Sequence, residues 1–231
     1  MRNSLRTPMA LLFSVISFCG FSQNAEDQIQ HYLNDNKEAL ELTESDIQNW
    51  RISDQHFAKQ TNLHHVYISQ EYNGTEIFGS NAVFAMKGDN VVLTGNRLEQ
   101  NISGKIVSPA ASLTNVEAIY AAANSLNLEV PLTIDRLEDK DAETSVFSAP
   151  GLSLEPIPVR LVYFVEEDQL TLAWKLSIYE LSTDHWWEVL VNANDGTLVE
   201  KYDWVVSCSF GHDHSAENHG TIARRDLSSV P

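Results

Sequence analysis

The sequence contains few cysteines, few basic residues and no long hydrophobic run. Two cysteines among 231 residues exclude a disulfide framework and a cysteine-only zinc cluster. Fifteen lysines and arginines stand against 32 aspartates and glutamates, which gives a formal net charge of -17. Because that charge repels a phosphate backbone, we expect no nucleic-acid partner. A hydrophobic content of 43% nevertheless predicts a folded, acidic, globular protein.

The amino terminus has the pattern of a secretory signal. Arg2 and Arg6 precede an apolar run over residues 9–21, which is shorter than the about 20 residues that a membrane span needs. We expect residues 1–22 to be removed, with cleavage after Ser22. A lipoprotein anchor at Cys19 is the alternative, which the bulky Phe18 before it disfavours. The prediction is a secreted, extracellular protein, at most periplasmic in transit, without a stable membrane anchor after cleavage.

The remaining chain alternates between helical and β patterns. Helices are predicted from Asn24 as N-cap to about residue 40, in a short turn from Thr43 to Trp50, and over residues 114–126, where Thr114 and Glu117 form a capping-box pattern. Short β runs with Asn/Gly/Asp turns fill residues 51–94 and 161–204. Residues 138–158 break this periodicity and carry acids and prolines, so a mobile acidic loop is expected there.

These patterns predict an α+β fold made of two subdomains, each a helix on an antiparallel sheet. The expected boundaries are residues 23–105 for the first subdomain and 106–206 for the second, and residues 207–231 form a polar tail or linker. Removing the predicted signal leaves only Cys208, so no disulfide within the chain is expected to stabilise the secreted form.

No catalytic motif is present. No histidine begins a His-Glu-x-x-His zinc motif, and no Gly-x-Ser-x-Gly elbow occurs. The segment from His185 to Glu188 is nearest to an inverted zinc motif, but it lacks the final histidine and is interpreted as an aromatic strand. We therefore expect no catalytic residue and no cofactor in this chain. The candidate metal ligands lie in the tail, where a flexible linker is the favoured alternative: Cys208, His212, His214 and His219.

The stretch over residues 65–79 resembles the fungalysin/thermolysin propeptide (FTP) motif. In that family a strand ends in Gln, an aromatic residue and Gly, and a second strand follows. Residues 116–126, 158–163, 172–176 and 189–196 are similar to the PepSY-like part of such pro-regions, which have a cystatin-like layout. Asn192 replaces a usual acid and Glu76 a usual proline. The positions that match are Gln70, Tyr72, Gly74, Ile77, Trp174 and Gly196.

The resemblance covers about residues 26–206 and implies a function. Such a region inhibits a secreted fungalysin-type zinc metallopeptidase and assists its folding, so the implied partner is a cognate catalytic domain, in cis or in trans. Zinc would belong to that domain. Because no zinc motif occurs before Pro231, we expect either a truncated or fragmentary precursor or a free-standing protein. The alternative function is a secreted PepSY/FTP-type interaction module or a trans-acting protease inhibitor.

Overall fold

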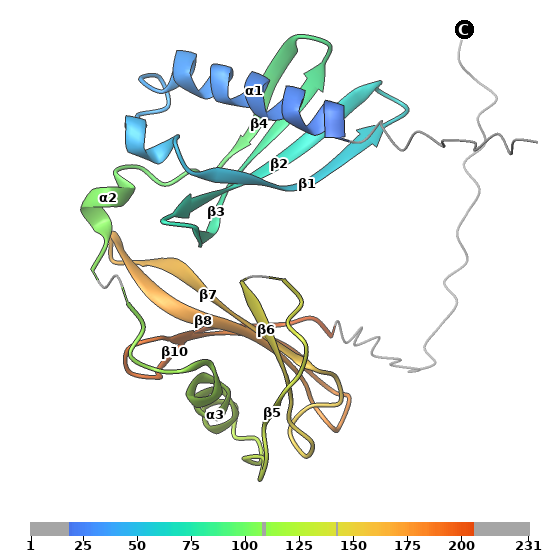
Figure 1. Ribbon diagram of the computed structural model, residues 1–231, viewed down its shortest axis with the longest axis vertical. Helices are drawn as coiled ribbons and strands as arrows, with labels where there is room; N and C mark the ends of the chain where they lie inside the picture. Colours follow the sequence, from blue (N-terminus) through green and yellow to red (C-terminus); the bar gives the residue numbers. More distant parts are fainter. Residues whose placement is uncertain (1–18, 108–109, 142, 206–231) are drawn as a thin grey trace, which may run out of the picture.

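In the computed structural model, residues 19–107, 110–141 and 143–205 are described. The first half of the chain places helix α1 (Cys19–Asn36) across one face of four antiparallel strands (Figure 1). The strands are β1 (Trp50–Ala58), β2 (Leu63–Tyr72), β3 (Thr75–Lys87) and β4 (Asn90–Asn96), with a 3-10 turn, η1 (Glu44–Asp46), before them. The apolar side of α1, represented by Ile29 and Leu33, packs on Val66, Ile68 and Phe84.

The second half repeats this plan with other elements. Helix α3 (Asn115–Ser125) covers one face of β7 (Ile157–Glu166), β8 (Gln169–Tyr179), β9 (Trp186–Asn192) and β10 (Leu198–Asp203). Two short strands, β5 (Asp135–Arg136) and β6 (Thr144–Ser148), extend the β7 edge. A single-turn helix, α2 (Ile102–Lys105), links the halves. The predicted α+β class is confirmed, with a helix on an antiparallel sheet in each half.

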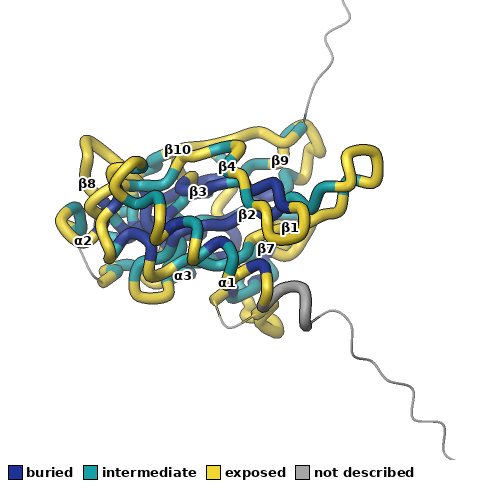
Figure 2. The backbone as a smooth tube through the Cα atoms, turned by 90° about the horizontal axis from the view of Figure 1, so that it is seen from above, coloured by how far each residue is buried: buried dark blue, intermediate teal, exposed yellow. Residues whose placement is uncertain are grey.

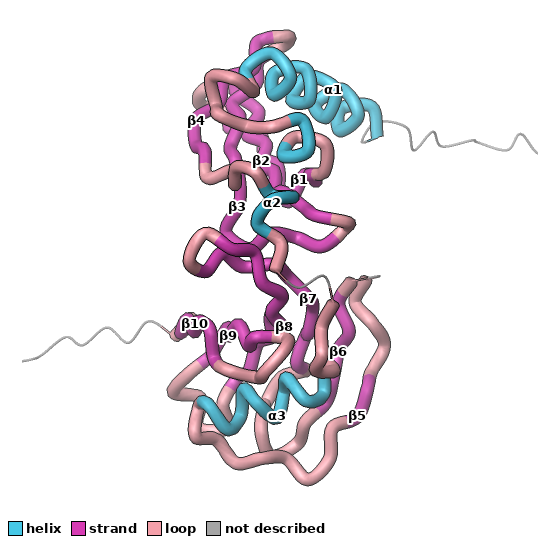
Figure 3. The backbone as a smooth tube through the Cα atoms, turned by 90° about the vertical axis from the view of Figure 1, so that its left-hand side faces the viewer, coloured by secondary structure: helices cyan, strands magenta, loops and turns pink. Residues whose placement is uncertain are grey.

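The two halves share strand pairing. Ile77 of β3 pairs in parallel with Tyr163 of β7, so the strand order runs β1-β2-β3-β7-β8-β9-β10. A second bridge joins Ile106 to Leu170. Figure 3 shows α1 and α3 at opposite ends, with β3 and β7 between them. Figure 2 shows the buried backbone in the middle of the molecule and exposed loops around it. The predicted division at residue 105 remains a prediction.

Local sequence signals account for the turns and for α3. Asn73 and Gly74 both have positive φ, of 50° and 79°, as a two-residue hairpin turn of type I′ requires. The side chain of Thr114 accepts the Glu117 N–H, and the Glu117 carboxylate accepts the Thr114 N–H, so the predicted capping box is confirmed. Gly196 also has a positive φ, of 79°, at the turn before β10.

Three local predictions are wrong. Helix α1 begins at Cys19, so Asn24 lies inside it and accepts a hydrogen bond from Gln28 instead of acting as the N-cap. The turn after Thr43 ends at Asp46, and Trp50 opens β1, because pairing with Gln70 extends the chain there. The helix also runs through the predicted cleavage position, and removal of residues 1–22 stays a prediction.

The third correction concerns residues 138–158, which are not an acidic loop. They contain β6 and the start of β7, paired in register from Thr144 with Arg160 to Phe147 with Ile157. Phe147 and Leu152 are each 2% exposed and pack in the core beneath α3. The acids that dominate the composition lie at the exposed ends of this segment, so its few apolar residues determine the structure. The tail with Cys208, His212, His214 and His219 lies outside the described residues, as do residues 1–18.

Candidate functional site

Gln70 is a buried connector near the end of β2. Its side chain is 1% exposed, and its amide nitrogen donates to the carbonyl oxygens of Asp46 at 2.9 Å and Glu99 at 3.1 Å. Its amide oxygen accepts the Glu99 N–H at 2.6 Å and the hydroxyl of Ser80. Every polar atom of this amide is therefore engaged, and Gln70 joins η1 to the segment that follows β4.

Asp46 makes a second buried connection close to Gln70. Its carboxylate is 1% exposed and accepts the backbone N–H groups of Thr43, Asn101 and Ile102, each at 2.8 Å. A buried carboxylate is costly unless it is hydrogen-bonded, and the bonds from Asn101 and Ile102 hold the start of α2 against η1. The entry into the second half is thus fixed by polar contacts of the first half.

The hairpin that joins β2 and β3 reaches into the second half. The Tyr72 ring meets the Tyr163 ring edge-on, with centroids 5.8 Å apart. Ile77 is fully buried in a cluster that contains Tyr163, Leu170 and Leu172. Gly74 forms the tip of this hairpin. Among the motif positions in this hairpin, Gln70 connects elements of the first half and Gly74 forms the turn. Tyr72 and Ile77 dock onto the second sheet.

The other two motif positions support α3. The indole N–H of Trp174 donates to the carbonyl oxygen of Leu113 at 2.9 Å. A Cβ atom at Gly196 would lie 3.3 Å from the Leu113 side chain and 3.4 Å from Ala121. Both positions therefore hold the segment that leads into α3, so all six motif positions have packing or turn roles in the described structure.

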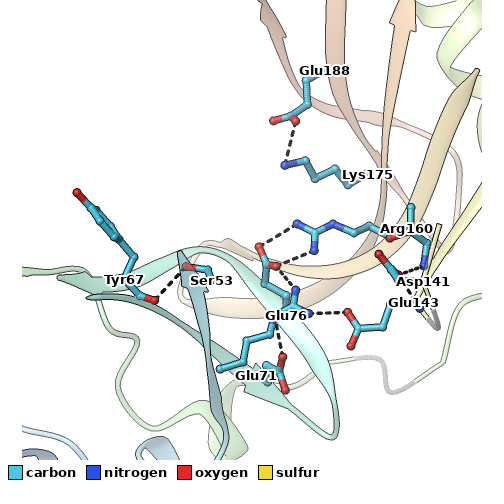
Figure 4. Close-up of polar contacts among 11 residues, drawn as sticks. Ser53, Tyr67, Glu71, Glu76, Asp141, Glu143, Arg160, Lys175 and Glu188 are labelled. Carbon is cyan, nitrogen blue, oxygen red and sulfur yellow. Dashed lines mark hydrogen bonds and ion pairs between the residues drawn. The ribbon is translucent and has the colours of Figure 1, made fainter. Parts of the chain in front are cut away.

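Glu76 is the centre of a charge cluster at the junction of the halves (Figure 4). Its carboxylate accepts from Nη2 of Arg51 at 2.7 Å, and from Nη1 and Nη2 of Arg160 at 2.8 and 3.1 Å. Arg51 also meets Glu71 at 3.1 Å and Glu143 at 2.9 Å. Strands β1, β2, β3 and β7 and the segment before β6 thus meet at one point. We refer to these five residues as the junction cluster.

Within the junction cluster, the pKa values of Glu76 and Glu71 are shifted in opposite directions. Burial opposes ionisation of Glu76, but Arg160 and Arg51 outweigh it and hold the pKa of Glu76 below its usual value. Burial raises the pKa of Glu71; Arg51 opposes this rise, and the charges of Glu143 and Glu76 add to it. The sequence indicates only that Glu76 departs from a family motif, since its two arginines are distant along the chain.

A cleft of about 670 Å³ opens at the junction between the halves. Its lining comes from β3, from the residues after β4, from the end of β7 and from β10. It combines aromatic rings with charges of both signs, as its main side chains show: Phe78, Arg97, Glu99, Phe164, Glu166 and Tyr202. Such a lining suits a protein surface better than a small molecule enclosed in an apolar cavity.

The second sheet has one face that α3 does not cover. Because side chains alternate along a strand, Leu176 and Ile178 face α3, whereas Lys175, Ser177 and Tyr179 lie on the opposite side, here called the open face. Near the junction, Phe78 packs over this side beside Val162, Phe164, Ala173 and Leu190. Two hollows of about 330 and 310 Å³ lie along the same side, both lined by Pro158 and Ser177, and the larger one reaches Arg160.

His185 and Asp203 form an ion pair at the end of β10. Nδ1 of His185 lies 2.6 Å from Oδ2 of Asp203, and the imidazole stacks on Trp187 at 4.8 Å. Asp203 also accepts the backbone N–H groups of Trp186 and Val205. The bond with Asp203 raises the pKa of His185 above its usual value. The predicted aromatic strand here is confirmed as β9.

Within the described parts of the chain, no group of three or more histidine, cysteine, aspartate or glutamate side chains is placed to hold a metal ion. Among the same residues, no helix has the length and apolar character needed to cross a membrane. The polar clusters described above are closed by hydrogen bonds and ion pairs. The junction cleft and the open face are two surfaces that a partner can contact.

Sequence comparison finds similarity to fungal extracellular metalloproteinases. The chain is 28% identical to extracellular metalloproteinase mep of Aspergillus niger over 187 residues, 75% of this chain and 28% of that protein. It is 29% identical to the mep protein of Aspergillus fumigatus over 78% of this chain and 30% of that protein. For extracellular metalloproteinase 10 of Coccidioides posadasii the identity is 28%, over 70% and 26% of the two chains.

These similarities confirm the resemblance to secreted fungalysin-type metalloproteinases. The chain spans less than a third of the length of these curated relatives. No family model matches the chain. Among solved structures, the C-terminal domain of Bacillus megaterium YpeB aligns with a TM-score of 0.35 and 10% identity, over 78% of this chain and 64% of that one.

Proposed function

We propose that this chain is the pro-region of a secreted fungalysin-type metalloproteinase, and that it inhibits the catalytic domain and assists its folding. The observation that carries the proposal is the similarity to extracellular metalloproteinases across most of this chain, but across less than a third of theirs. A segment of that size, folded as two sheets with exposed cleft and face, suits a companion of the catalytic domain. Secretion of this chain belongs to the same proposal.

The physical basis of inhibition is binding and not chemistry. A domain attached in cis acts at a high effective concentration, so a modest interface is enough to block an active site. The chain itself then needs no cofactor, and the zinc belongs to the catalytic domain. A partner in trans requires a tighter interface, because association costs translational and rotational freedom.

Inhibition and folding assistance are tested with the full chain and the isolated catalytic domain of the Aspergillus niger relative. We expect the chain to slow hydrolysis of a peptide substrate and to raise the yield of active protease refolded from denaturant. Serum albumin at equal mass controls for nonspecific protection, and a serine protease controls for specificity. The proposal is wrong if the chain neither inhibits the metalloproteinase nor raises its refolding yield above the albumin control.

A further inference from the structure

A row of exposed aromatic side chains crosses the open face at the end farthest from the junction. Trp186 of β9 pairs with Tyr179 of β8, and their rings stack with centroids 5.0 Å apart. The backbone N–H of Trp204 donates to the backbone carbonyl oxygen of Trp186, so Trp204 lies opposite Trp186 just after β10 and extends the row. Pro156 lines the same hollow as Tyr179 and Trp186. We refer to Trp204, Trp186, Tyr179 and Pro156 as the aromatic stripe.

The aromatic stripe is not explained by the core of the second half. That core lies on the other face, beneath α3. Trp204 is 62% exposed and Trp186 is 42% exposed, so both rings leave much apolar surface in water. Exposed apolar patches on soluble proteins mark interaction sites, and tryptophan and tyrosine dominate the binding energy of such sites. The stripe therefore has the composition of an interface centre.

The stripe is also held in place before any partner arrives. The indole N–H of Trp186 donates to the hydroxyl of Ser177 at 2.8 Å, and the stacked Tyr179 ring limits its rotation. Lys175 and Glu188, on the same face, already pair at 2.9 Å, and each is less than one fifth exposed. A partner that covers this face orders few side chains and leaves few unpaired charges, which reduces the cost of binding.

The position of the stripe favours an occupant attached to the same chain. The described residues end at Val205, whose N–H donates to Asp203 directly beside Trp204. A protein that continues past this point leaves β10 next to the stripe. Glu155 lines the hollow beside Tyr179 and Trp186, and Asp203 accepts the backbone N–H of Trp186. Asp184 precedes Trp186 by two residues, so the matching surface is an apolar patch with a basic rim.

We propose that the aromatic stripe is the surface on which the metalloproteinase catalytic domain docks. The proposal rests on the proposed function and adds the place of contact to it. Docking there keeps the start of the connecting segment next to the bound protease. Acids around the stripe steer a basic rim toward it, so the association weakens as salt concentration rises.

The test compares two double variants of the full chain as inhibitors of the Aspergillus niger catalytic domain. Trp186→Ser with Trp204→Ser removes the stripe. Phe57→Ser with Leu132→Ser removes two side chains that are 50% and 98% exposed in other parts of the structure, and serves as the matched control. We expect the inhibition constant to rise at least tenfold for the first variant, and to stay within about twofold for the control, where no docking contact is removed.

A second readout measures contact directly. Oxidative footprinting of the wild-type chain with and without protease should show protection of Trp186 and Trp204, while Trp50, which bonds to Gln30 beneath α1, stays unchanged. If the double variant does not fold by circular dichroism, the single variant Trp204→Ser, which removes the more exposed ring, replaces it.

Two results would overturn the proposal, and they are distinguishable. The stripe is not the docking surface if the wild-type chain inhibits the protease, the double variant inhibits it equally well, and footprinting shows no protection of either tryptophan. The proposed function would then remain intact. A wild-type chain that neither inhibits the protease nor assists its refolding refutes the proposed function, and the docking surface with it. A tenfold loss in the stripe variant alone, with protection of both rings, supports the surface.

Discussion

Replacing Glu76 with glutamine removes the carboxylate that two arginines share at the junction of the halves. The change keeps the size of the side chain, so packing around Ile77 stays nearly the same. Arg51 retains Glu71 and Glu143, but both contacts from Arg160 to Glu76 lose their negative partner. The variant therefore tests how strongly the junction cluster holds the two sheets together.

The magnitude follows from burial. Breaking a fully buried ion pair costs about 3–5 kcal/mol, and an exposed pair contributes about 0–1 kcal/mol. The Glu76 side chain is 14% exposed and that of Arg160 is 23% exposed, between these limits. We expect Glu76→Gln to lower the free energy of unfolding by about 2 kcal/mol. For a chain of this size that is a fall in Tm of about 4–8 °C.

The dependence on pH gives an internal check. The folded-state pKa of Glu76 is lower than its usual value, so its contribution is fully present above the unfolded pKa. The contribution is lost as pH falls through the folded pKa. Urea unfolding, monitored by tryptophan fluorescence, should therefore give a higher free energy of unfolding for the wild type than for the variant at pH 7. The two free energies should converge in acid.

The matched control is Asp139→Asn, which breaks an ion pair with Arg136 on the surface. Both of its side chains are more than 40% exposed, so water and salt screen the pair. We expect a clearly smaller change than for Glu76→Gln. Equal effects of the two variants, or a difference between wild type and Glu76→Gln that persists unchanged in acid, would refute the reasoning from burial.

Three further variants test other contacts. Gln70→Leu should lower the free energy of unfolding by about 3 kcal/mol in urea titration, because the carbonyl oxygen of Asp46 and the buried hydroxyl of Ser80 lose their bonds to the Gln70 amide. Gly196→Ala should cost about 1–2 kcal/mol, measured the same way, because alanine disfavours a positive φ. His185→Asn should lower Tm more at pH 6 than at pH 9: the pKa of His185 is raised, so its pairing with Asp203 stabilises fully below the unfolded pKa and is lost as pH rises through the folded pKa.

The sequence predicts elements whose determinants are local. The capping residues Thr114 and Glu117 stand three apart and define the start of α3, and Asn73-Gly74 requires a tight hairpin turn whatever surrounds it. The strand at residues 144–148 was not predicted, because its determinants are not local. This strand exists because β7 pairs with it and because Phe147 reaches the core under α3, and the local sequence pattern shows neither contact.

The candidate sites divide in the same way. Motif positions such as Gln70 and Trp174 are recognisable from their neighbours in the chain, but their roles depend on partners many residues away. The junction cluster brings Glu76 together with Arg160, across 84 positions. Trp204 and Trp186 are visible in the sequence as aromatic residues, but only the pairing of β9 with β10 places them side by side.

The amino-acid sequence was enough to establish the acidic charge, the α+β class with a helix on each sheet, the main turns and the resemblance to secreted metalloproteinases. These properties follow from composition, periodicity and short motifs, which need no distant partner. The folded chain was needed to show that one glutamate joins two arginines at the junction, and that an aromatic stripe remains on the face opposite α3. Both depend on which strands pair and which face a helix covers, and these are set by long-range packing.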